Sequence, residues 1–301
     1  MPPLRPAATE AISARYRDLD AWTPAEMLQA MWEGQLAAVA AGQAALPAIA
    51  AAVAAAVPRL SCGGRLAYVG AGTSGRIGVQ DGAELPPTFD WPADRLLLLM
   101  AGGDAAFTRS IEGAEDDAAD GRARIAAQSI GPGDVVIGIA ASGSTPFTTA
   151  AIVEAAGRGA LTVGVANSAG GTLLAASAHP ILVETGAEVI AGSTRMKAGT
   201  AQKMVLNLFS SALMVQLGRV HQGLMVDMQA RNVKLRHRAA RMLRHLTGAG
   251  DAAIGAALAA TAGRVKPAVL VLHGLDAAAA DALLERSSGR LRVALAGLGA
   301  A

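Results

Sequence analysis

Five short apolar runs, each followed by glycine or hydroxyl residues, recur through the middle of the chain. Their centres are mostly apolar without strict alternation, which is typical of parallel strands buried on both faces. Most intervals between them are long enough for a crossover helix, so the pattern predicts βαβ units in an open α/β sheet with flanking helices. The runs are Arg65–Gly72, Arg95–Gly102, Asp134–Gly143, Leu161–Ser168 and Pro180–Gly186.

Helical patterns are expected on both sides of these runs. Thr23 is predicted to be an N-cap, with Pro24 in the first turn and Glu26 as its capping-box partner, for a helix that reaches Gly42. A second helix is expected to follow and to stop at Pro58.

Longer helices are predicted after the last strand, from Gly199 to Leu217 and from Val226 to Leu246. The tail alternates helix-length stretches with glycine breaks. We therefore expect three parts, namely an N-terminal helical segment (residues 1–60), a sheet domain (residues 61–247) and a small C-terminal helical domain (residues 248–301).

The stretch from Leu36 to Val57 is the most apolar part of the chain, and it raises the question of a membrane span. It is largely alanine and contains Gln43 and Pro47, so a packed helix pair is favoured over a span. The N-terminus has no uninterrupted apolar core and is not expected to be a signal peptide.

Composition narrows the class of protein. Hydrophobic residues make up 52% and charged residues 17% of the 301 residues, which excludes a disordered chain. The net charge of +2 is a small excess, so nucleic acid is not an expected partner. Cys62 is the only cysteine, so no internal disulfide can form, and a reducing cytoplasm is the expected location.

The first predicted strand ends in GAGTSG, Gly70 to Gly75, which satisfies the pattern G-x-G-x-x-G. A dinucleotide site of this kind also needs an acidic residue at the end of the second strand, to hold the ribose. The second strand ends instead in Met100 and small residues, with Asp104 further on. The fingerprint alone is a weak signal for a nicotinamide or flavin site.

A second turn of the same kind, Ser142 to Thr148, ends the third strand and includes Gly143, Ser144 and Thr145. Two hydroxyl-rich turns that each open a helix offer backbone N–H groups, hydroxyls and two helix dipoles. This combination suits one phosphate monoester, here held by Ser74, Ser142 and Thr145 with help from the backbone N–H groups of residues 143 and 144. The alternative is that these hydroxyls only cap the helices.

A third polar cluster lies in the segment from Glu184 to Gln202. It surrounds a predicted helix start and consists of Glu188, Ser193, Thr194, Arg195 and Lys197. Charged groups here either face a sugar phosphate or serve as caps and solvated cations. The spacing alone leaves these two interpretations open.

Two acidic segments could carry acid–base chemistry. Glu84 stands before the pair Pro86-Pro87, which is expected to end a helix and fix the loop. Glu115 lies in the run EGAEDD, and by composition such a run is usually a solvated helix face. The five histidines show no zinc-ligand spacing and cysteines are not paired, so no metal site is expected.

Several ordered motifs together resemble one family, the N-acetylmuramic acid 6-phosphate etherases of the sugar isomerase (SIS) domain superfamily. The motifs are GAGTSGRIG, DGAELPPTF, EGAEDD, GIAASGSTPF, GAEVIAGSTRMKAGTAQKMVLNLFSSALM and LMVDMQARNVKLR. The resemblance covers residues 65–246 closely and the C-terminal segment more loosely. The opening segment follows the family loosely, and Ser144 replaces a larger, often basic residue.

The resemblance implies a SIS-type fold and a homodimer without metal or organic cofactor. It implies cleavage of the lactyl ether of N-acetylmuramic acid 6-phosphate to D-lactate and N-acetylglucosamine 6-phosphate, by elimination and rehydration. Glu84 falls on the family's proton donor and Glu115 on its second catalytic glutamate. The substrate-binding residues implied at matching positions are Gly72, Thr73, Ser74, Ser142, Gly143, Ser144, Thr145, Glu188, Ser193 and Lys197.

Two other functions remain as alternatives. A non-catalytic regulatory protein of the same superfamily, like the glucokinase regulatory protein, would bind a sugar phosphate without cleaving it. Such a protein is expected to hold two SIS domains, whereas this chain has room for one. A sugar-phosphate isomerase is the other alternative, and it would release no lactate.

Overall fold

All five predicted strands form one parallel sheet in the computed structural model, which describes residues 7–228 and 233–299. The strand order is β2-β1-β3-β4-β5, so the expected open α/β sheet with flanking helices is confirmed. Every residue of β1, β3 and β4 is buried, which explains their uninterrupted apolar sequences. The strands are β1 (Leu66–Gly70), β2 (Leu96–Met100), β3 (Val135–Ala140), β4 (Leu161–Ala166) and β5 (His179–Leu182).

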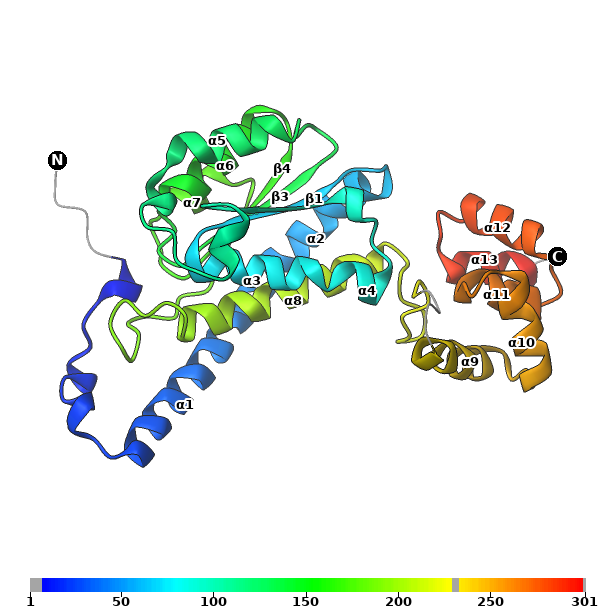
Figure 1. The fold of residues 1–301 in the computed structure, drawn as a ribbon, viewed down its shortest axis with the longest axis horizontal. Helices are drawn as coiled ribbons and strands as arrows, with labels where there is room; N and C mark the ends of the chain where they lie inside the picture. The colour runs from blue at the N-terminus through cyan, green and yellow to red at the C-terminus, as the bar shows by residue number, and fades with distance from the viewer. Residues whose placement is uncertain (1–6, 229–232, 300–301) are drawn as a thin grey trace. The chain divides into compact units, whose positions relative to one another are not determined.

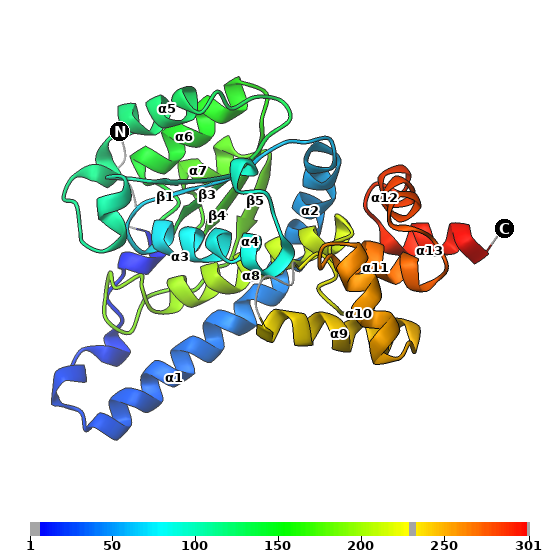
Figure 2. The ribbon, with the colours of Figure 1, turned by 45° about the vertical axis from the view of Figure 1, so that its right-hand side comes forward.

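Helices cover both faces of this sheet (Figures 1 and 2). One face carries α5 (Ala118–Ala127), α6 (Pro146–Gly157) and α7 (Thr172–Ala176), and the other carries α2 (Leu46–Ser61), α3 (Gly72–Ala83) and the start of α8 (Lys197–Gln216). Right-handed crossovers require this division, because α3 leads from β1 to one edge whereas α5 leads back past β1 to β3. The gap between the carboxyl ends of β1 and β3 is therefore a topological switch point, where ligands bind in open α/β sheets.

The N-terminal helices follow the sequence prediction in part. Helix α1 (Pro24–Ala41) begins with the expected capping box, since the Glu26 backbone N–H donates to Oγ1 of Thr23 and the Thr23 N–H donates back to the Glu26 carboxylate. The predicted stop at Pro58 is wrong, because α2 continues through this proline to Ser61. A proline in the last turn removes only one intrahelical hydrogen bond, so the helix can end three residues later.

The stretch from Pro24 to Ser61 is long and apolar enough to cross a membrane by length and composition, and one third (33%) of its most apolar window is buried within the chain. The large buried side chains of this stretch are on α2, where Ile49, Val53 and Leu60 pack toward the sheet. Helix α1 is different, because it leaves a row of large apolar side chains exposed.

The chain divides into two compact units, the first made of residues 1–83 and 94–210 and the second of residues 84–93 and 211–301. The second unit has its own apolar core, in which Met242 and Leu243 of α9 pack with residues of the four helices that follow. Helix α9 thus shares a core with the tail, although the sequence analysis placed it with the sheet. The helices that lie wholly in the second unit are α4 (Leu85–Phe89), α9 (Val233–Thr247), α10 (Asp251–Ala260), α11 (Val265–Leu272), α12 (Ala277–Arg286) and α13 (Leu291–Gly299).

Charged side chains stabilise the second unit through hydrogen bonds and an ion pair. Arg219 donates hydrogen bonds to the carbonyl oxygens of Phe89 and Asp90 at 2.7 and 2.9 Å, which ties the short α4 segment to the helices. Lys266 pairs with Asp227 at 2.6 Å, and Lys266 is 6% exposed. Residues 229–232 of the helix predicted from Val226 lie outside the described residues, and α9 begins after them.

Short 3₁₀ helices connect these elements. They are η1 (Ala8–Glu10), η2 (Ala14–Tyr16), η3 (Leu19–Ala21), η4 (Gly42–Ala45), η5 (Ala93–Arg95), η6 (Asp104–Phe107) and η7 (Ala114–Asp116). Two of them, η1 and η7, reach the carboxyl edge of the sheet.

Candidate active site

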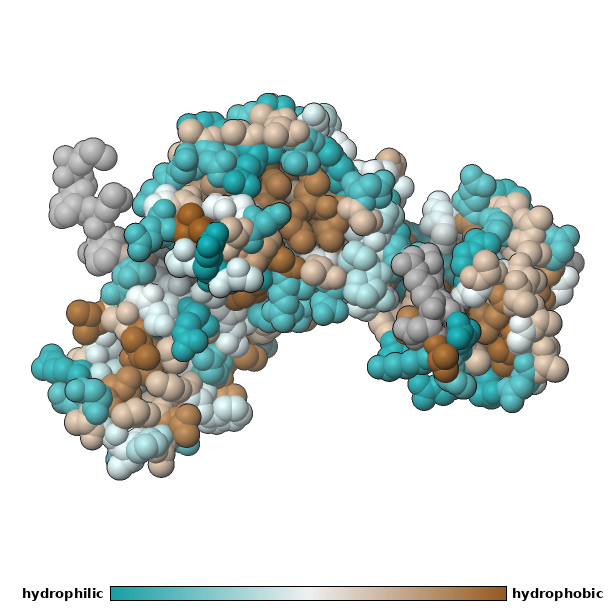
Figure 3. Space-filling view, viewed as in Figure 1, coloured by the Kyte–Doolittle hydropathy of each residue, from teal (hydrophilic) through white to brown (hydrophobic). Residues whose placement is uncertain are grey.

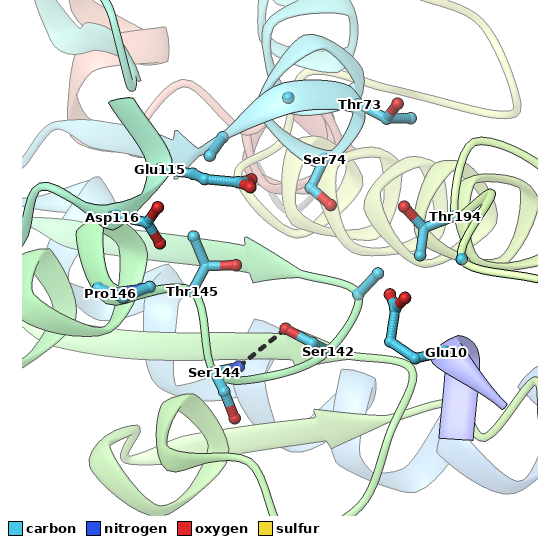
Figure 4. A pocket seen from close by; sticks show the side chains of 14 residues that line it. Glu10, Thr73, Ser74, Glu115, Asp116, Ser142, Ser144, Thr145, Pro146 and Thr194 are labelled. Carbon is cyan, nitrogen blue, oxygen red and sulfur yellow. Dashed lines mark hydrogen bonds between the residues drawn. The ribbon is translucent and has the colours of Figure 1, made fainter. Parts of the chain in front are cut away.

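A cavity of about 350 Å³ lies at the carboxyl ends of β1 and β3, where both hydroxyl-rich turns meet (Figure 4). The two turns are neighbours because β1 and β3 are adjacent strands, and each opens a helix, α3 or α6. We call this the first cavity. Its lining consists of Glu10, Ala71, Gly72, Thr73, Ser74, Glu115, Asp116, Ala141, Ser142, Ser144, Thr145, Pro146, Gly192 and Thr194.

The first turn brings the N-terminus of α3 onto the end of β1. Gly72 has φ +52°, which favours glycine, and a Cβ at Gly75 would lie 2.7 Å from the carbonyl oxygen of Gly70. This close approach lets α3 start directly beyond β1, with Thr73 and Ser74 in its first turn. The first N–H groups of a helix have no intrahelical partner, so they are available to an anion in the cavity.

The second turn uses its polar groups differently from the sequence prediction. Gly143 has φ +71°, donates its N–H to the carbonyl of Ala140 at 3.0 Å and does not line the cavity. Its N–H is therefore engaged in the turn itself. Ser142 and Thr145 do line the cavity, and Thr145 is the N-cap of α6 with no side-chain capping bond.

Three carboxylates border the first cavity. Glu115 and Asp116 project from η7, and Glu10 enters from the opposite side (Figure 4). The lining contains six hydroxyl side chains and no lysine, arginine or histidine. An anion bound here would rely on hydroxyls, backbone N–H groups and the N-termini of α3 and α6.

Glu10 is a lining residue that the sequence analysis missed. It is placed by its neighbour Thr9, which is fully buried, and whose carbonyl accepts a hydrogen bond from the Gly192 N–H at 3.3 Å. The Thr9 hydroxyl also lies 3.5 Å from that of Ser168, at the end of β4. These contacts join distant parts of the chain and leave no local pattern in the sequence.

The third cluster is mainly structural. Glu188 is 1% exposed and its carboxylate accepts hydrogen bonds from the backbone N–H groups of Lys197 and Ala198, which caps the N-terminus of α8. The Lys197 ammonium donates to the carbonyl of Thr185 at 2.7 Å. Burial lowers the pKa of Lys197, and the charge of Glu188 partly offsets this effect.

None of Glu188, Ser193 and Lys197 lines the first cavity, and from this segment only Gly192 and Thr194 do so. The geometry thus favours the capping interpretation for Glu188. A direct contact of these three residues with substrate stays a prediction from the resemblance.

Glu84 directly follows α3 and is the N-cap of α4 in the second unit. It is exposed, and it is not among the residues that line the first cavity. At about 1.5 Å per residue, the 12 residues of α3 carry the chain about 18 Å away from the turn that holds Thr73 and Ser74. Its neighbour Asp81 is buried and accepts a hydrogen bond from the Tyr68 hydroxyl at 2.9 Å.

No cluster of three or more histidine, cysteine, aspartate or glutamate side chains suited to a metal ion occurs among residues 7–228 and 233–299. The expectation that no metal or organic cofactor takes part stays a prediction.

Comparison with known proteins decides the family. The chain is 51% identical over 291 residues to the N-acetylmuramic acid 6-phosphate etherase of Deinococcus radiodurans, which is 96% of this chain and 95% of that protein. The chain belongs to the N-acetylmuramic acid 6-phosphate etherase family. It is also 46% identical to the N-acetylmuramic acid 6-phosphate etherase of Streptomyces avermitilis, over 97% of this chain and 94% of that protein, which agrees with this assignment.

Domain comparisons agree with the family. The glucokinase regulatory protein N-terminal SIS domain matches residues 48–156, and the SIS domain matches residues 117–212. A phosphoheptose isomerase from Francisella tularensis has a similar fold, with a TM-score of 0.50 and 20% identity, over 64% of this chain and all (100%) of that chain. The SIS-type fold expected from the motifs is thereby confirmed.

Proposed function

We propose that this chain is a carbon–oxygen lyase that cleaves the lactyl ether of N-acetylmuramic acid 6-phosphate, yielding D-lactate and N-acetylglucosamine 6-phosphate. The observation that carries the proposal is the extent of the family relationship, 51% identity across 96% of the chain. Such a reaction serves the recycling or catabolism of cell-wall amino sugars. The expected location is the cytoplasm, as the single cysteine already indicated.

The phosphate is placed in the first cavity. Hydroxyls of Ser74, Ser142 and Thr145 and the first N–H groups of α3 supply donors for its oxygens. Two helix N-termini add favourable electrostatic potential, which compensates for the missing cations. Glu10 offers acceptors for hydroxyl groups of the open-chain sugar.

The reaction begins on the ring-opened sugar, whose aldehyde makes the proton on C2 acidic. Glu115 removes this proton, the electron pair moves into a C2–C3 double bond and the C3–O bond to lactate breaks. Glu84 donates a proton to the departing oxygen. Glu84 then takes a proton from water as the water adds to C3, and Glu115 returns its proton to C2, so both glutamates end in their starting states.

The position of Glu84 supports a site completed by a second copy of the chain. Because α3 leads away from the first cavity, the Glu84 that serves one cavity is proposed to come from the partner of a homodimer. The dimer is also supported by α1, over which apolar surface gathers in Figure 3. Its exposed apolar residues share one face at helical spacing and are Leu28 (66% exposed), Trp32 (59%), Leu36 (51%) and Val39 (49%).

Two alternatives compete with the lyase. One is a non-catalytic sugar-phosphate binder, which the match of residues 48–156 to a glucokinase regulatory protein domain keeps as a second candidate. A sugar-phosphate isomerase would use the same cavity and a single base. Both alternatives predict binding of a sugar phosphate without loss of its substituent at C3.

Incubation of the purified chain with N-acetylmuramic acid 6-phosphate tests the proposal. The lyase releases D-lactate and N-acetylglucosamine 6-phosphate in equal amounts. A matched Glu115→Gln variant controls for contaminating activity, because loss of one acid–base group typically costs about 10²–10⁴-fold. Binding without lactate release would support the regulatory alternative, and a change of the sugar skeleton without lactate release would support the isomerase.

A further inference from the structure

A second cavity, of about 300 Å³, borders the first one near the ends of β1 and β2. The two cavities share Ala71, Gly72 and Glu115 as lining residues, so the Glu115 side chain lies where they adjoin. The second cavity is lined by Ala71, Gly72, Arg76, Met100, Ala101, Ala106, Ser110, Ile111, Glu112, Gly113, Ala114 and Glu115.

Arg76 is the only lysine or arginine among the residues that line either cavity. It lies on α3, one turn after Gly72, and it is half-buried. Its Nε–H donates to the carbonyl of Ala106 at 3.0 Å, and one N–H on Nη2 donates to the carbonyl of Arg109 at 3.1 Å. These bonds hold the guanidinium against the loop that carries Glu115.

The Arg76 guanidinium has N–H donors left over for a ligand. An arginine has five N–H donors, and the two hydrogen bonds of Arg76 use two of them. Arg76 forms no ion pair within the described residues, although Glu112 lines the same cavity. Its charge is therefore not neutralised by a neighbouring carboxylate, and its planar fork suits a carboxylate ligand.

The substrate of the proposed function carries two anionic groups, a phosphate at one end and the lactyl carboxylate on C3. The first cavity provides hydroxyls and helix N-termini for the phosphate but no cation for a second anion. We propose that the second cavity is the subsite for the lactyl group and that Arg76 binds its carboxylate. The inference rests on the proposed function and names the subsite for the leaving group.

The arrangement also fits the chemistry. With the phosphate in the first cavity and the lactyl carboxylate in the second, C3 of the sugar lies on the path between the two anchors, and C2 is bonded to it. Glu115 is the ionisable side chain that lines both cavities, so it faces the carbon atoms that react. Arg76 and the phosphate donors thus orient the substrate on both sides of the proton-abstracting carboxylate.

Inhibition of the wild-type protein provides the first test and requires no variant. D-Lactate should inhibit lactate release from N-acetylmuramic acid 6-phosphate, whereas D-lactamide, which has nearly the same shape but no charge, should inhibit at least about 10-fold less. Equal inhibition by D-lactate and D-lactamide would overturn the subsite. The subsite would also be wrong if neither compound inhibited at concentrations up to about 100-fold above those at which N-acetylglucosamine 6-phosphate inhibits.

The second test compares substrate with product in an Arg76→Gln variant. We expect the KM for N-acetylmuramic acid 6-phosphate to rise about 10- to 100-fold, because a charge-assisted carboxylate contact is lost. The inhibition constant of N-acetylglucosamine 6-phosphate, which lacks the lactyl group, should stay within about twofold of wild type. An Arg76→Lys variant keeps the charge but not the planar fork, so its KM for N-acetylmuramic acid 6-phosphate should lie between those of wild type and Arg76→Gln.

Arg109→Gln is the matched control, because Arg109 is an exposed cation on the same loop and does not line either cavity. Its KM and its inhibition by D-lactate should equal those of wild type. If Arg76→Gln weakened the sugar product as much as the substrate, Arg76 would only support the loop and the inference would be wrong. Absence of lactate release by the wild-type protein would instead refute the proposed function itself.

Discussion

The backbone N–H of Ser144 donates a hydrogen bond to Oγ of Ser142 over a donor–acceptor distance of 3.2 Å. Because the Ser142 oxygen accepts this bond within the turn, its own O–H group can still donate to an acceptor in the first cavity. The second turn therefore presents a hydroxyl donor to the first cavity at the end of β3.

Replacing Ser142 and Thr145 together by alanine should raise the KM for N-acetylmuramic acid 6-phosphate more than it lowers kcat. The phosphate is bound throughout the reaction, so its donors stabilise the ground state and the transition state equally. We expect a rise of about 100-fold or more, from two hydrogen bonds to a charged group. Thr108→Ala, a hydroxyl deletion outside the lining of the first cavity, is the control, and a double variant with an unchanged KM would contradict the phosphate assignment.

A hydrogen-exchange experiment should distinguish the roles of Glu84 and Glu115. In heavy water, Glu84→Gln should lose lactate release but still exchange the hydrogen on C2, because Glu115 remains to remove it. Glu115→Gln should lose both activities, each by about 10²–10⁴-fold. Retained exchange in Glu115→Gln together with lost exchange in Glu84→Gln would show that the two roles are reversed.

Mixed dimers test the origin of Glu84. Co-expression of Glu84→Gln and Glu115→Gln chains with different tags gives mixed dimers in which one site is fully wild type if Glu84 acts on the partner's cavity. Random pairing makes about half of the dimers mixed, so about one quarter of wild-type activity should return. If the mixture stays as inactive as the separate variants, each cavity uses the Glu84 of its own chain.

The ion pair of Asp134 with Arg65 should make stability depend on pH. Asp134 is 6% exposed and accepts hydrogen bonds from Arg65 at 2.7 to 3.1 Å. Burial raises the pKa of Asp134, but the hydrogen bonds from Arg65 and the Gly131 N–H outweigh it, so that the pKa lies below its usual value. A lowered pKa in the folded state means that the carboxylate stabilises the fold above about pH 4, and that this stabilisation is lost as the pH falls through the folded-state pKa.

An Asp134→Asn variant should therefore be less stable than wild type by about 2–4 kcal/mol at pH 7. Urea unfolding should show the difference shrinking below about pH 4. The surface pair of Asp120 with Arg124 provides a control, since Asp120→Asn should cost less than about 1 kcal/mol. A difference that stays constant down to pH 2 would contradict the role of the charge.

The sheet was predictable because its strands are buried on both faces and therefore have uninterrupted apolar sequences. The turns at Gly72 and Ser142 were predictable for a related reason, since helix starts need glycine, serine, threonine and proline at set positions. The stop at Pro58 was wrong because sequence does not reveal how close a proline lies to the natural end of its helix.

The rest of the site depends on tertiary contacts. Glu10 reaches the first cavity only because Thr9 is buried against distant segments, and no local pattern records such a contact. Glu188 was a candidate for a ligand contact, but in the structure its carboxylate caps α8. A charged residue at a helix start serves either purpose, and only the fold distinguishes them.

In the proposed reaction, lactate leaves from C3 of the sugar by elimination and water adds at the same carbon. The most direct measurement is the reaction of N-acetylmuramic acid 6-phosphate in ¹⁸O-labelled water, followed by mass spectrometry of both products. Elimination and rehydration at C3 should leave one ¹⁸O atom at C3 of N-acetylglucosamine 6-phosphate and none in D-lactate from the cleaved bond. Label in the lactate hydroxyl with an unlabelled C3 would place the broken bond on the lactyl side and contradict this reaction.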